Sequence, residues 1–252
     1  MAAPVAVQLY SLREEAARDF RSVLRSVGDA GFVGVELAGY HDLTPAEVAA
    51  VLADCGLVVA SGHVGPDPAL LPAALDALQT AGGDTAIVAF LPPATFATES
   101  SVAEAADQLN ACAAIAADAG VTLGYHNHWW EFEQRFGDER AWWRFLDLVD
   151  PAVVVELDMY WATVGGDDPK AVIGRLGDRL RLLHVKDGPG DDPEAPMVAV
   201  GSGALDITGL LESAPWVDWH VVELDRCATD MTTAVADSCR WLTSNGLSAG
   251  RS

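Results

Sequence analysis

Positively charged residues are scarce in this chain. Its 252 residues include 15 Lys and Arg against 37 Asp and Glu, and the formal net charge is −22. Such a surface repels phosphate backbones and anionic membranes, which argues against a nucleic-acid or membrane partner. No stretch of the sequence approaches the roughly 18 uninterrupted apolar residues of a membrane helix. These absences leave small molecules as the expected partners.

Cysteine is also sparse. The four cysteines are widely spaced and form no CxxC pair: Cys55, Cys112, Cys227 and Cys239. This usage is typical of a reducing compartment and not of a disulfide framework. The first seven residues, Met-Ala-Ala-Pro-Val-Ala-Val, lack a basic segment and a long apolar stretch, so no signal peptide is predicted. We therefore expect a cytoplasmic protein.

The chain lacks a glycine-rich dinucleotide fingerprint and a phosphate-binding P-loop motif. What it contains instead is a regular alternation of short apolar, β-branched runs with stretches of helical spacing. The runs, interpreted as strands, are Val5–Tyr10, Gly34–Ala38, Leu57–Ser61, Thr85–Phe90, Val121–Tyr125, Val153–Leu157, Arg181–Val185 and His220–Leu224. Between the second and third runs, Thr44, Pro45 and Glu47 predict a helix that begins with a capping box.

Eight strand–helix units in 252 residues predict an α/β fold, a single (β/α)8 TIM barrel that forms one domain over residues 1–252. A doubly wound open sheet is the alternative, but eight units in this length favour closure. No linker or low-complexity segment interrupts the pattern. In such a barrel the chemistry lies at the carboxyl ends of the strands.

Carboxylates and imidazoles gather at those expected strand ends. They stand among Gln8, Glu36, His63, Tyr125-His126-Asn127-His128, Glu156-Leu157-Asp158, His184-Val185-Lys186-Asp187 and Glu223-Leu224-Asp225. A lone strand-end histidine is more often structural than a ligand, but charged groups that converge on one mouth need a partner when they are buried. A divalent cation satisfies them together. About three carboxylates and one imidazole without a thiolate suit Mn²⁺, Mg²⁺ or Co²⁺.

Lys186 is one of only two lysines and directly follows a strand. A surface position on the loop is the alternative, but its place at the mouth favours a substrate contact or an electrostatic role. A cation beside it would stabilise an enediolate, and carboxylates on opposite faces of the substrate would act as base and acid.

Seven short motifs carry a resemblance that spans nearly the whole chain. They are Val-Gln-Leu-Tyr-Ser-Leu-Arg at 7–13, Gly-Val-Glu-Leu-Ala at 34–38, Gly-Tyr-His-Asn-His at 124–128, Glu-Leu-Asp-Met-Tyr-Trp at 156–161, His-Val-Lys-Asp at 184–187, Gly-Ser-Gly at 201–203 and Val-Glu-Leu-Asp at 222–225. In this order the chain resembles the sugar phosphate isomerase/epimerase family of xylose isomerase-like TIM barrels.

The resemblance implies four metal ligands, of which Asp158, His184 and Glu223 match well. The first ligand is a glutamate at the end of strand five in the epimerase branch, where this chain has His126. Glu131 is the nearest candidate, as in the inosose dehydratase-like branch, and Glu133 is the fallback.

The resemblance also implies roles toward the substrate. Glu131 and Glu223 would be the acid/base pair, with His126 as a further catalytic group. The residues expected to contact substrate are Gln8, Glu36, His63, His126, His128, Trp161 and Lys186. Trp129 and Trp130 form an aromatic wall with Trp161, or else pack beneath a loop.

The leading hypothesis is a divalent-metal-dependent isomerase or epimerase of a keto-sugar or related polyol that acts through an enediolate. The alternative is a metal-dependent lyase or dehydratase of a keto-inositol or 3-keto-glycoside, with His126 or His128 as the acid. An apurinic endonuclease is disfavoured by the net charge and by Trp161, which stands where such enzymes have a ligand histidine. A barrel that only binds a ligand, and a homo-oligomer, both stay open.

Overall fold

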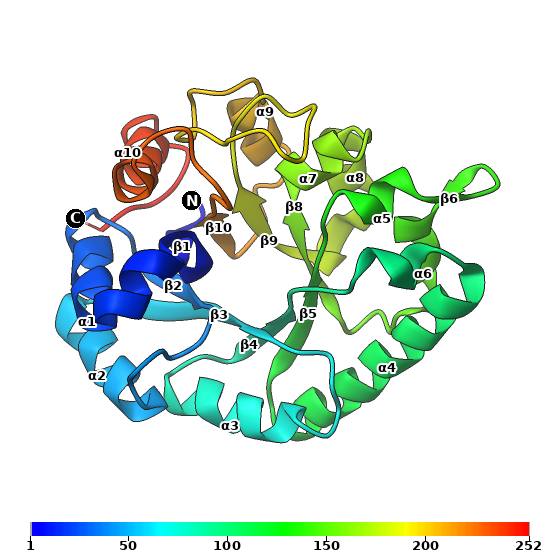
Figure 1. The fold of residues 1–252 in the computed structure, drawn as a ribbon, viewed down its shortest axis with the longest axis horizontal. Helices are drawn as coiled ribbons and strands as arrows, with labels where there is room; N and C mark the ends of the chain where they lie inside the picture. The colour runs from blue at the N-terminus through cyan, green and yellow to red at the C-terminus, as the bar shows by residue number, and fades with distance from the viewer. Residues whose placement is uncertain (1, 252) are drawn as a thin grey trace.

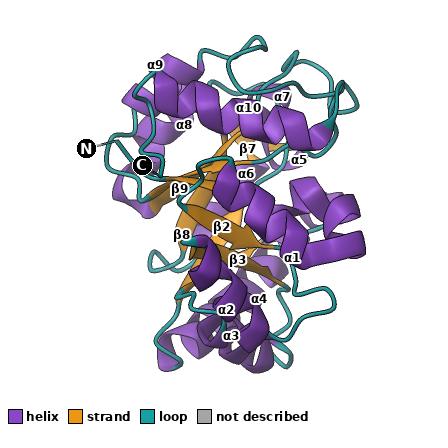
Figure 2. Cartoon of the chain, turned by 90° about the vertical axis from the view of Figure 1, so that its left-hand side faces the viewer, coloured by secondary structure: helices purple, strands orange, loops and turns teal. Residues whose placement is uncertain are grey.

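The computed structural model describes residues 2–251. Eight parallel strands close into a barrel in the order β1-β10-β9-β8-β5-β4-β3-β2, and the helices lie around it (Figure 1). The same arrangement is visible in Figure 2, where the strands lie in the middle of the molecule with helices on either side. The predicted (β/α)8 TIM barrel is therefore confirmed.

The barrel strands are four to seven residues long. They are β1 (Val5–Gln8), β2 (Gly34–Leu37), β3 (Val58–Val64), β4 (Thr85–Val88), β5 (Thr122–His126), β8 (Val154–Asp158), β9 (Leu180–Val185) and β10 (Trp219–Val222). Two further two-residue strands, β6 (Arg135–Phe136) and β7 (Glu139–Arg140), form a small antiparallel hairpin outside the barrel.

The α-helices follow the strands along the chain. They are α1 (Arg13–Asp29), α2 (Pro45–Cys55), α3 (Leu71–Thr80), α4 (Glu99–Asp118), α5 (Trp130–Glu133), α6 (Ala141–Leu148), α7 (Met159–Val164), α8 (Pro169–Leu176), α9 (Ile207–Glu212) and α10 (Met231–Ser244). Three 3-10 turns, η1 (Leu9–Leu12), η2 (Pro93–Phe96) and η3 (Gly177–Arg179), complete the set.

The start of α2 illustrates how local chemistry sets an element. The Thr44 hydroxyl accepts the Glu47 N–H at 3.3 Å, and the Glu47 carboxylate accepts the Thr44 N–H at 2.9 Å. The predicted capping box is therefore confirmed. The helix ends at Gly56, whose φ of 65° is a left-handed conformation that glycine adopts without strain.

The barrel interior changes from apolar to charged along the strands. Its apolar floor is a separate cluster of five side chains: Ala6, Ala60, Ile87, Leu182 and Val221. Because every second residue of a strand faces the same side, the next inward step from Ala6, Leu182 and Val221 reaches Gln8, His184 and Glu223. Two residues further along each of these strands, the side chain that faces the interior is therefore polar or ionisable instead of apolar.

Some predicted boundaries differ from the structure. The first strand ends at Gln8 instead of Tyr10, because the Gln8 side chain accepts the Tyr10 N–H at 2.9 Å and starts a 3-10 turn. The third strand extends to Val64, so His63 lies within it instead of after it. Helices α5 and α7 were not predicted; they have only four and six residues, too few to show a helical period.

The two ends of the described chain lie side by side, since the Ala249 N–H donates to the Ala3 carbonyl at 2.9 Å. Among residues 2–251, every helix is too short or too polar to cross a bilayer.

Candidate metal centre

Three predicted ligands meet at the carboxyl ends of neighbouring strands. Asp158 at the end of β8 is the register partner of His184 on β9, and Glu223 directly follows β10. The last residue of β5, His126, joins them. All four side chains are buried, and one ligand atom from each lies within 4.8 Å of the others.

Asp158 is held by the Asn127 side chain and by the backbone of α7. The Asn127 amide oxygen accepts the Asp158 N–H at 2.9 Å, and its amide nitrogen donates to the Asp158 carbonyl at 3.2 Å. One carboxylate oxygen of Asp158, Oδ1, caps α7 by accepting the Trp161 N–H at 2.8 Å. The other oxygen, Oδ2, is therefore left to face the group of four.

Several atoms of this group are buried without a hydrogen-bond partner among the described residues. They are Asp158 Oδ2, Glu223 Oε2, His184 Nδ1 and His126 Nδ1. Three of these atoms do have ion-pair contacts: Asp158 Oδ2 and Glu223 Oε2 with Lys186 Nζ, and His184 Nδ1 with Glu223 Oε2. Such atoms are costly to bury, and the costs add when carboxylates stand close together. A divalent cation would serve all of them at once, so the donor set fits a metal of the predicted class.

Lys186 lies inside this centre and not on the surface. Its Nζ is 2.9 Å from Asp158 Oδ2, 2.8 Å from Glu223 Oε2 and 2.6 Å from Asp225 Oδ2, and the residue is 1 % exposed. Burial would lower the pKa of Lys186, but the three carboxylates outweigh it and raise that pKa well above its ordinary value. The ammonium group thus balances the charge of the expected ligands.

Glu131 lies outside the group of four. It is fully buried, and its two oxygens accept the Tyr125 hydroxyl at 2.9 Å and the His128 N–H at 3.0 Å. Burial raises the pKa of Glu131 to about 8. The structure does not bring its carboxylate into the group of four, and Glu131 as the first ligand stays a prediction. The fallback, Glu133, is exposed to solvent.

The imidazoles at the mouth divide into two electrostatic classes. Burial lowers the pKa of His128 to about 3 and that of His126 well below its ordinary value, so both are neutral at neutral pH. Burial opposes charge on His63 too, but the carboxylates of Glu36 and Glu156 outweigh it and raise its pKa to about 10. Burial likewise opposes charge on His184, but Glu156, Glu223 and Glu36 raise its pKa well above its ordinary value. The charged imidazoles therefore lie on β3 and β9, and the neutral ones at and after the end of β5.

A cavity of about 550 Å³ opens above the centre. Five of the predicted site residues line it: His63, His126, His128, Trp161 and Glu223. Gln8, Glu36 and Lys186 are buried and are not among its lining residues. Their predicted contact with substrate stays a prediction.

The other side chains at the cavity are largely aromatic or cationic. Trp129 and Trp130 line it as predicted, joined by four residues to which the sequence analysis gave no substrate role: Tyr10, Arg13, Phe90 and Arg226. Phe90 and Tyr10 are about half exposed at the rim. Each lies two residues past the end of its strand, β4 and β1 respectively.

Glu156 is the main buried group that sequence reasoning left without a role. It is fully buried on β8, and neither of its oxygens has a hydrogen-bond partner within the described chain. The signal was its spacing of two from Asp158, which places both carboxylates on the inner side of the same strand.

Comparison with known proteins agrees with the barrel fold. A model of the family described as xylose isomerase-like TIM barrel matches residues 24–245. The chain belongs to this family. No curated protein matches it.

Three solved structures illustrate the breadth of the xylose isomerase-like fold. A sugar phosphate isomerase/epimerase from Parabacteroides distasonis is 23 % identical, with a TM-score of 0.85 over 99 % of this chain and 96 % of that one. The IOLI protein with a bound zinc atom is 14 % identical, with a TM-score of 0.77 over 97 % and 98 %. The probable 3-DHS dehydratase AsbF from Bacillus anthracis is also 14 % identical, with a TM-score of 0.76 over 95 % and 98 %.

One further feature of this xylose isomerase-like barrel positions the loop after β9. The buried carboxylate of Asp187 accepts the backbone N–H groups of Gly188, Gly201, Gly203 and Leu205 at 2.9 to 3.3 Å. A Cβ on Gly203 would lie 2.0 Å from that carboxylate, so glycine is required there. The His-Val-Lys-Asp and Gly-Ser-Gly motifs are therefore parts of one structural unit beside the metal centre.

Proposed function

We propose that this barrel is a divalent-metal-dependent isomerase or epimerase of a keto-sugar or related polyol that acts through an enediolate. The observation that carries the proposal is the buried group of Asp158, His184 and Glu223, whose ligand atoms converge beneath an open cavity. A small-molecule substrate and a cytoplasmic location accompany the proposal, on the acidic charge and the cysteine usage.

The cation would be held by Asp158, His184 and Glu223, with either Glu131 or His126 as the fourth ligand. Mn²⁺, Mg²⁺ and Co²⁺ remain the first candidates because carboxylate oxygens predominate. When bound, the cation would supply Lewis-acid stabilisation of negative charge on adjacent substrate oxygens.

The side chains around the cavity supply the proton chemistry. Glu223 lines the cavity and is positioned to take a proton from the carbon next to the substrate carbonyl. Glu131 does not line the cavity, but burial raises its pKa to about 8, so it would exchange a proton near neutral pH. His63 carries a proton at the cavity wall and can donate it to an oxygen of the substrate.

The aromatic side chains bind and shield the substrate. Trp129 packs on Trp161 with ring centroids 4.7 Å apart, and His128 is stacked on Trp130 at 4.3 Å. Such faces suit the apolar side of a sugar ring. By excluding water they also strengthen electrostatic interactions at the reacting carbon.

Deuterium exchange tests this proposal. The metal-loaded protein in D₂O should place carbon-bound deuterium in sugar recovered from a panel of keto-sugars. Chelation or Asp158→Asn should abolish the exchange, and Asp218→Asn at the opposite end of the barrel should leave it unchanged. Metal-loaded protein that exchanges no proton in any substrate it turns over would contradict the enediolate.

A metal-dependent lyase or dehydratase is the second candidate. The wide, aromatic rim favours it, because a cavity of about 550 Å³ has room for a substituent beyond a single sugar ring. The barrel of the probable dehydratase from Bacillus anthracis has the same fold. His126 and His128, being neutral, fit a hydrogen-bonding role toward the leaving group better than that of an acid. An unsaturated product or a released aglycone would select this function over isomerisation.

A further inference from the structure

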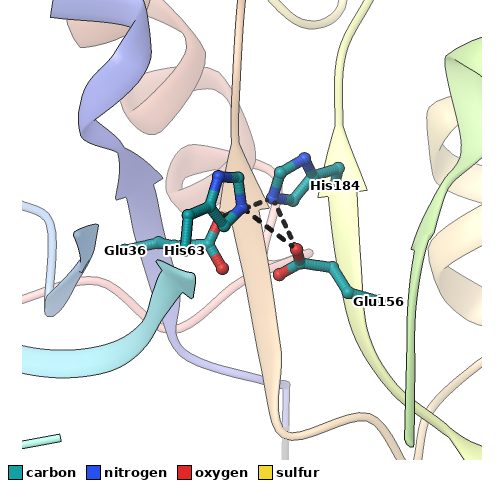
Figure 3. A group of neighbouring side chains, drawn as sticks. All are labelled: Glu36, His63, Glu156 and His184. Atoms are coloured by element: carbon teal, nitrogen blue, oxygen red, sulfur yellow. Dashed lines mark hydrogen bonds and ion pairs between the residues drawn. The ribbon is translucent and has the colours of Figure 1, made fainter. Parts of the chain in front are cut away.

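A second group of four potential ligands lies deeper in the barrel. Glu36 on β2, His63 on β3, Glu156 on β8 and His184 on β9 point toward one another across the interior (Figure 3). One ligand atom from each lies within 4.8 Å of the others. His184 alone is shared with the centre described above, so this lower group is a distinct donor set.

The separations in the lower group are within a few tenths of an ångström of those between ligands of one cation. Glu36 Oε1 is 2.8 Å from His184 Nε2 and 2.9 Å from His63 Nε2, and Glu156 Oε2 is 3.2 Å and 3.6 Å from the same two nitrogens. Metal–ligand bonds of about 2.1 Å place neighbouring donor atoms roughly 3.0 to 3.4 Å apart in octahedral or tetrahedral sites. One of the four distances lies in that range, two are slightly shorter and one is slightly longer, so small side-chain shifts would bring the four atoms to the spacing that one cation needs.

Glu156 supplies an independent reason to expect an occupant. It is fully buried, yet neither carboxylate oxygen has a hydrogen bond of acceptable geometry within residues 2–251. Glu36, in contrast, accepts a hydrogen bond at each oxygen: Gln8 Nε2 donates to Oε1 and Ser61 Oγ donates to Oε2, both at 2.5 Å. Gln8 Nε2 also lies 3.0 Å from His63 Nε2. One carboxylate is thus held by neighbouring polar side chains, and the other has only ion-pair contacts of its Oε2 with the surrounding histidines.

His184 can serve both groups because its two ring nitrogens face opposite ways. Nδ1 lies 2.8 Å from Glu223 Oε2 in the upper group, and Nε2 lies 2.8 Å from Glu36 Oε1 in the lower group. When both nitrogens are ligands, both ring protons are released to solvent. His63 lines the open cavity with a partly exposed side chain, which gives a cation a route to the lower group.

We propose that Glu36, His63, Glu156 and His184 bind a second divalent cation of the first transition row inside the barrel. Two imidazoles and two carboxylates favour Zn²⁺, Fe²⁺ or Co²⁺ over Mg²⁺ or Ca²⁺. The second cation would lie next to the first, with His184 between the two. The proposal needs no particular sugar chemistry and is tested by metal content alone, but with a cation bound His63 would be a ligand and would not donate a proton to the substrate.

Metal stoichiometry of the full chain tests the proposal. Protein stripped with a chelator and reloaded with Zn²⁺ should contain two ions per chain by elemental analysis and native mass spectrometry. Glu156→Gln, which is nearly isosteric, should reduce the content to one, and Asp218→Asn should keep two. One ion per chain in both the wild type and Glu156→Gln would overturn the proposal, because a proton network would then hold the lower group together.

Cobalt provides a readout that does not depend on catalysis. In the Asp158→Asn background, Co²⁺ should still produce visible absorption from the lower group, and adding Glu156→Gln should remove it. If Glu156→Gln fails to fold by circular dichroism, His63→Asn at the cavity wall replaces it and should cause the same loss. A cobalt spectrum that neither substitution changes would also overturn the proposal.

Discussion

The two ends of this barrel carry cavities of nearly equal size but opposite chemistry. The cavity at the carboxyl end of the strands has about 550 Å³ and the one at the amino end about 520 Å³. The amino-end cavity is lined by Pro4, Val59, Ala60, Asp84, Thr85, Thr122, Val154, Arg181, Leu182, Asp218 and Trp219. None of these has a buried side-chain atom without a hydrogen-bond partner in the described structure.

The ion pairs at the two ends make the contrast sharper. At the amino end, Arg181 and Asp218 form a pair 2.5 Å apart in which both side chains are nearly half exposed. At the carboxyl end, Lys186 and its carboxylates are almost fully buried. The volume of a cavity therefore does not by itself indicate a reaction site. Buried charged groups do, because their burial costs free energy that a bound ligand can offset.

The largest expected effect is the loss of activity when a ligand at the carboxyl end is changed. Glu223→Gln removes both a proposed metal ligand and the proposed base, so turnover should fall by about 10⁴-fold, equivalent to ~5 kcal/mol. Asp218→Asn should change turnover by less than about twofold, because an exposed pair contributes little. Steady-state kinetics with matched metal content checks both. Equal losses of turnover in the two variants would contradict the difference proposed between the two ends of the barrel.

A second expected effect concerns stability without metal. Lys186→Met leaves Asp158, Glu223 and Asp225 without their counter-ion, and breaking a buried pair in this way costs about 4 kcal/mol. Arg181→Met, the matched change at the amino end, should cost ~0.5 kcal/mol. Urea unfolding of chelated protein measures both.

Added divalent metal should restore much of the lost stability in Lys186→Met, since a cation can take over the neutralisation. If metal restores nothing, Lys186 does not compensate the charge of the ligands.

A third expected effect is a pH dependence of the free energy of unfolding that arises from the burial of a histidine and not from metal binding. His220 lies away from both cavities, 3 % exposed, with Nδ1 2.8 Å from the Ser248 hydroxyl. Burial lowers its pKa to about 4 from an ordinary value of 6.5. The unfolded chain therefore binds the proton first as pH falls, and the stability from this residue, present above pH 6.5, is lost as pH falls through 4.

That loss amounts to about 3 kcal/mol at one pKa unit per ~1.4 kcal/mol. His220→Gln should remove it, so the wild type should lose that much more unfolding free energy than the variant between pH 6.5 and 4. Measuring the difference between the two proteins cancels the titration of the carboxylates at the mouth. Parallel pH profiles would mean that His220 is protonated as readily when folded as when unfolded.

The sequence predicted those features that follow from strand period and strand ends. The eight strands and the convergence of Asp158, His184 and Glu223 depend on little else, because parallel strands present their carboxyl ends at one mouth. The lower group was not foreseen for a specific reason. The strand register shifts at Val35/Glu36 and at Val155/Glu156, next to the two glutamates involved. The spacing of two from Asp158 indicates that Glu156 faces inward, but register shifts decide which side chains meet across the strands, and they leave no mark in the apolar pattern.

The orientations of the side chains at the mouth could not be predicted from the sequence either. The direction of Glu131 is set by the four-residue helix α5 and by the Tyr125 hydroxyl. Lys186 was recognised by its rarity, but its three carboxylate partners come from β8, from the residue directly after β10, and from the loop beyond it. Such contacts depend on how separate strands meet, which local spacing does not encode.

The smallest expected effect tests the floor that separates the two ends. Gly124 on β5 faces Ile87, and a Cβ at that position would lie 2.5 Å from the Ile87 Cδ1 atom and 3.0 Å from a Val154 methyl group. Gly124→Ala should therefore overpack the interior and cost about 2 kcal/mol of unfolding free energy. Ile87→Val removes the closest atom, so the double variant should recover part of that cost. Metal content should stay unchanged in both variants, because the floor lies a layer below the ligands. If Gly124→Ala also released metal, the apolar floor and the charged layer would be one mechanical unit, and the contrast between the two ends would extend through the whole interior.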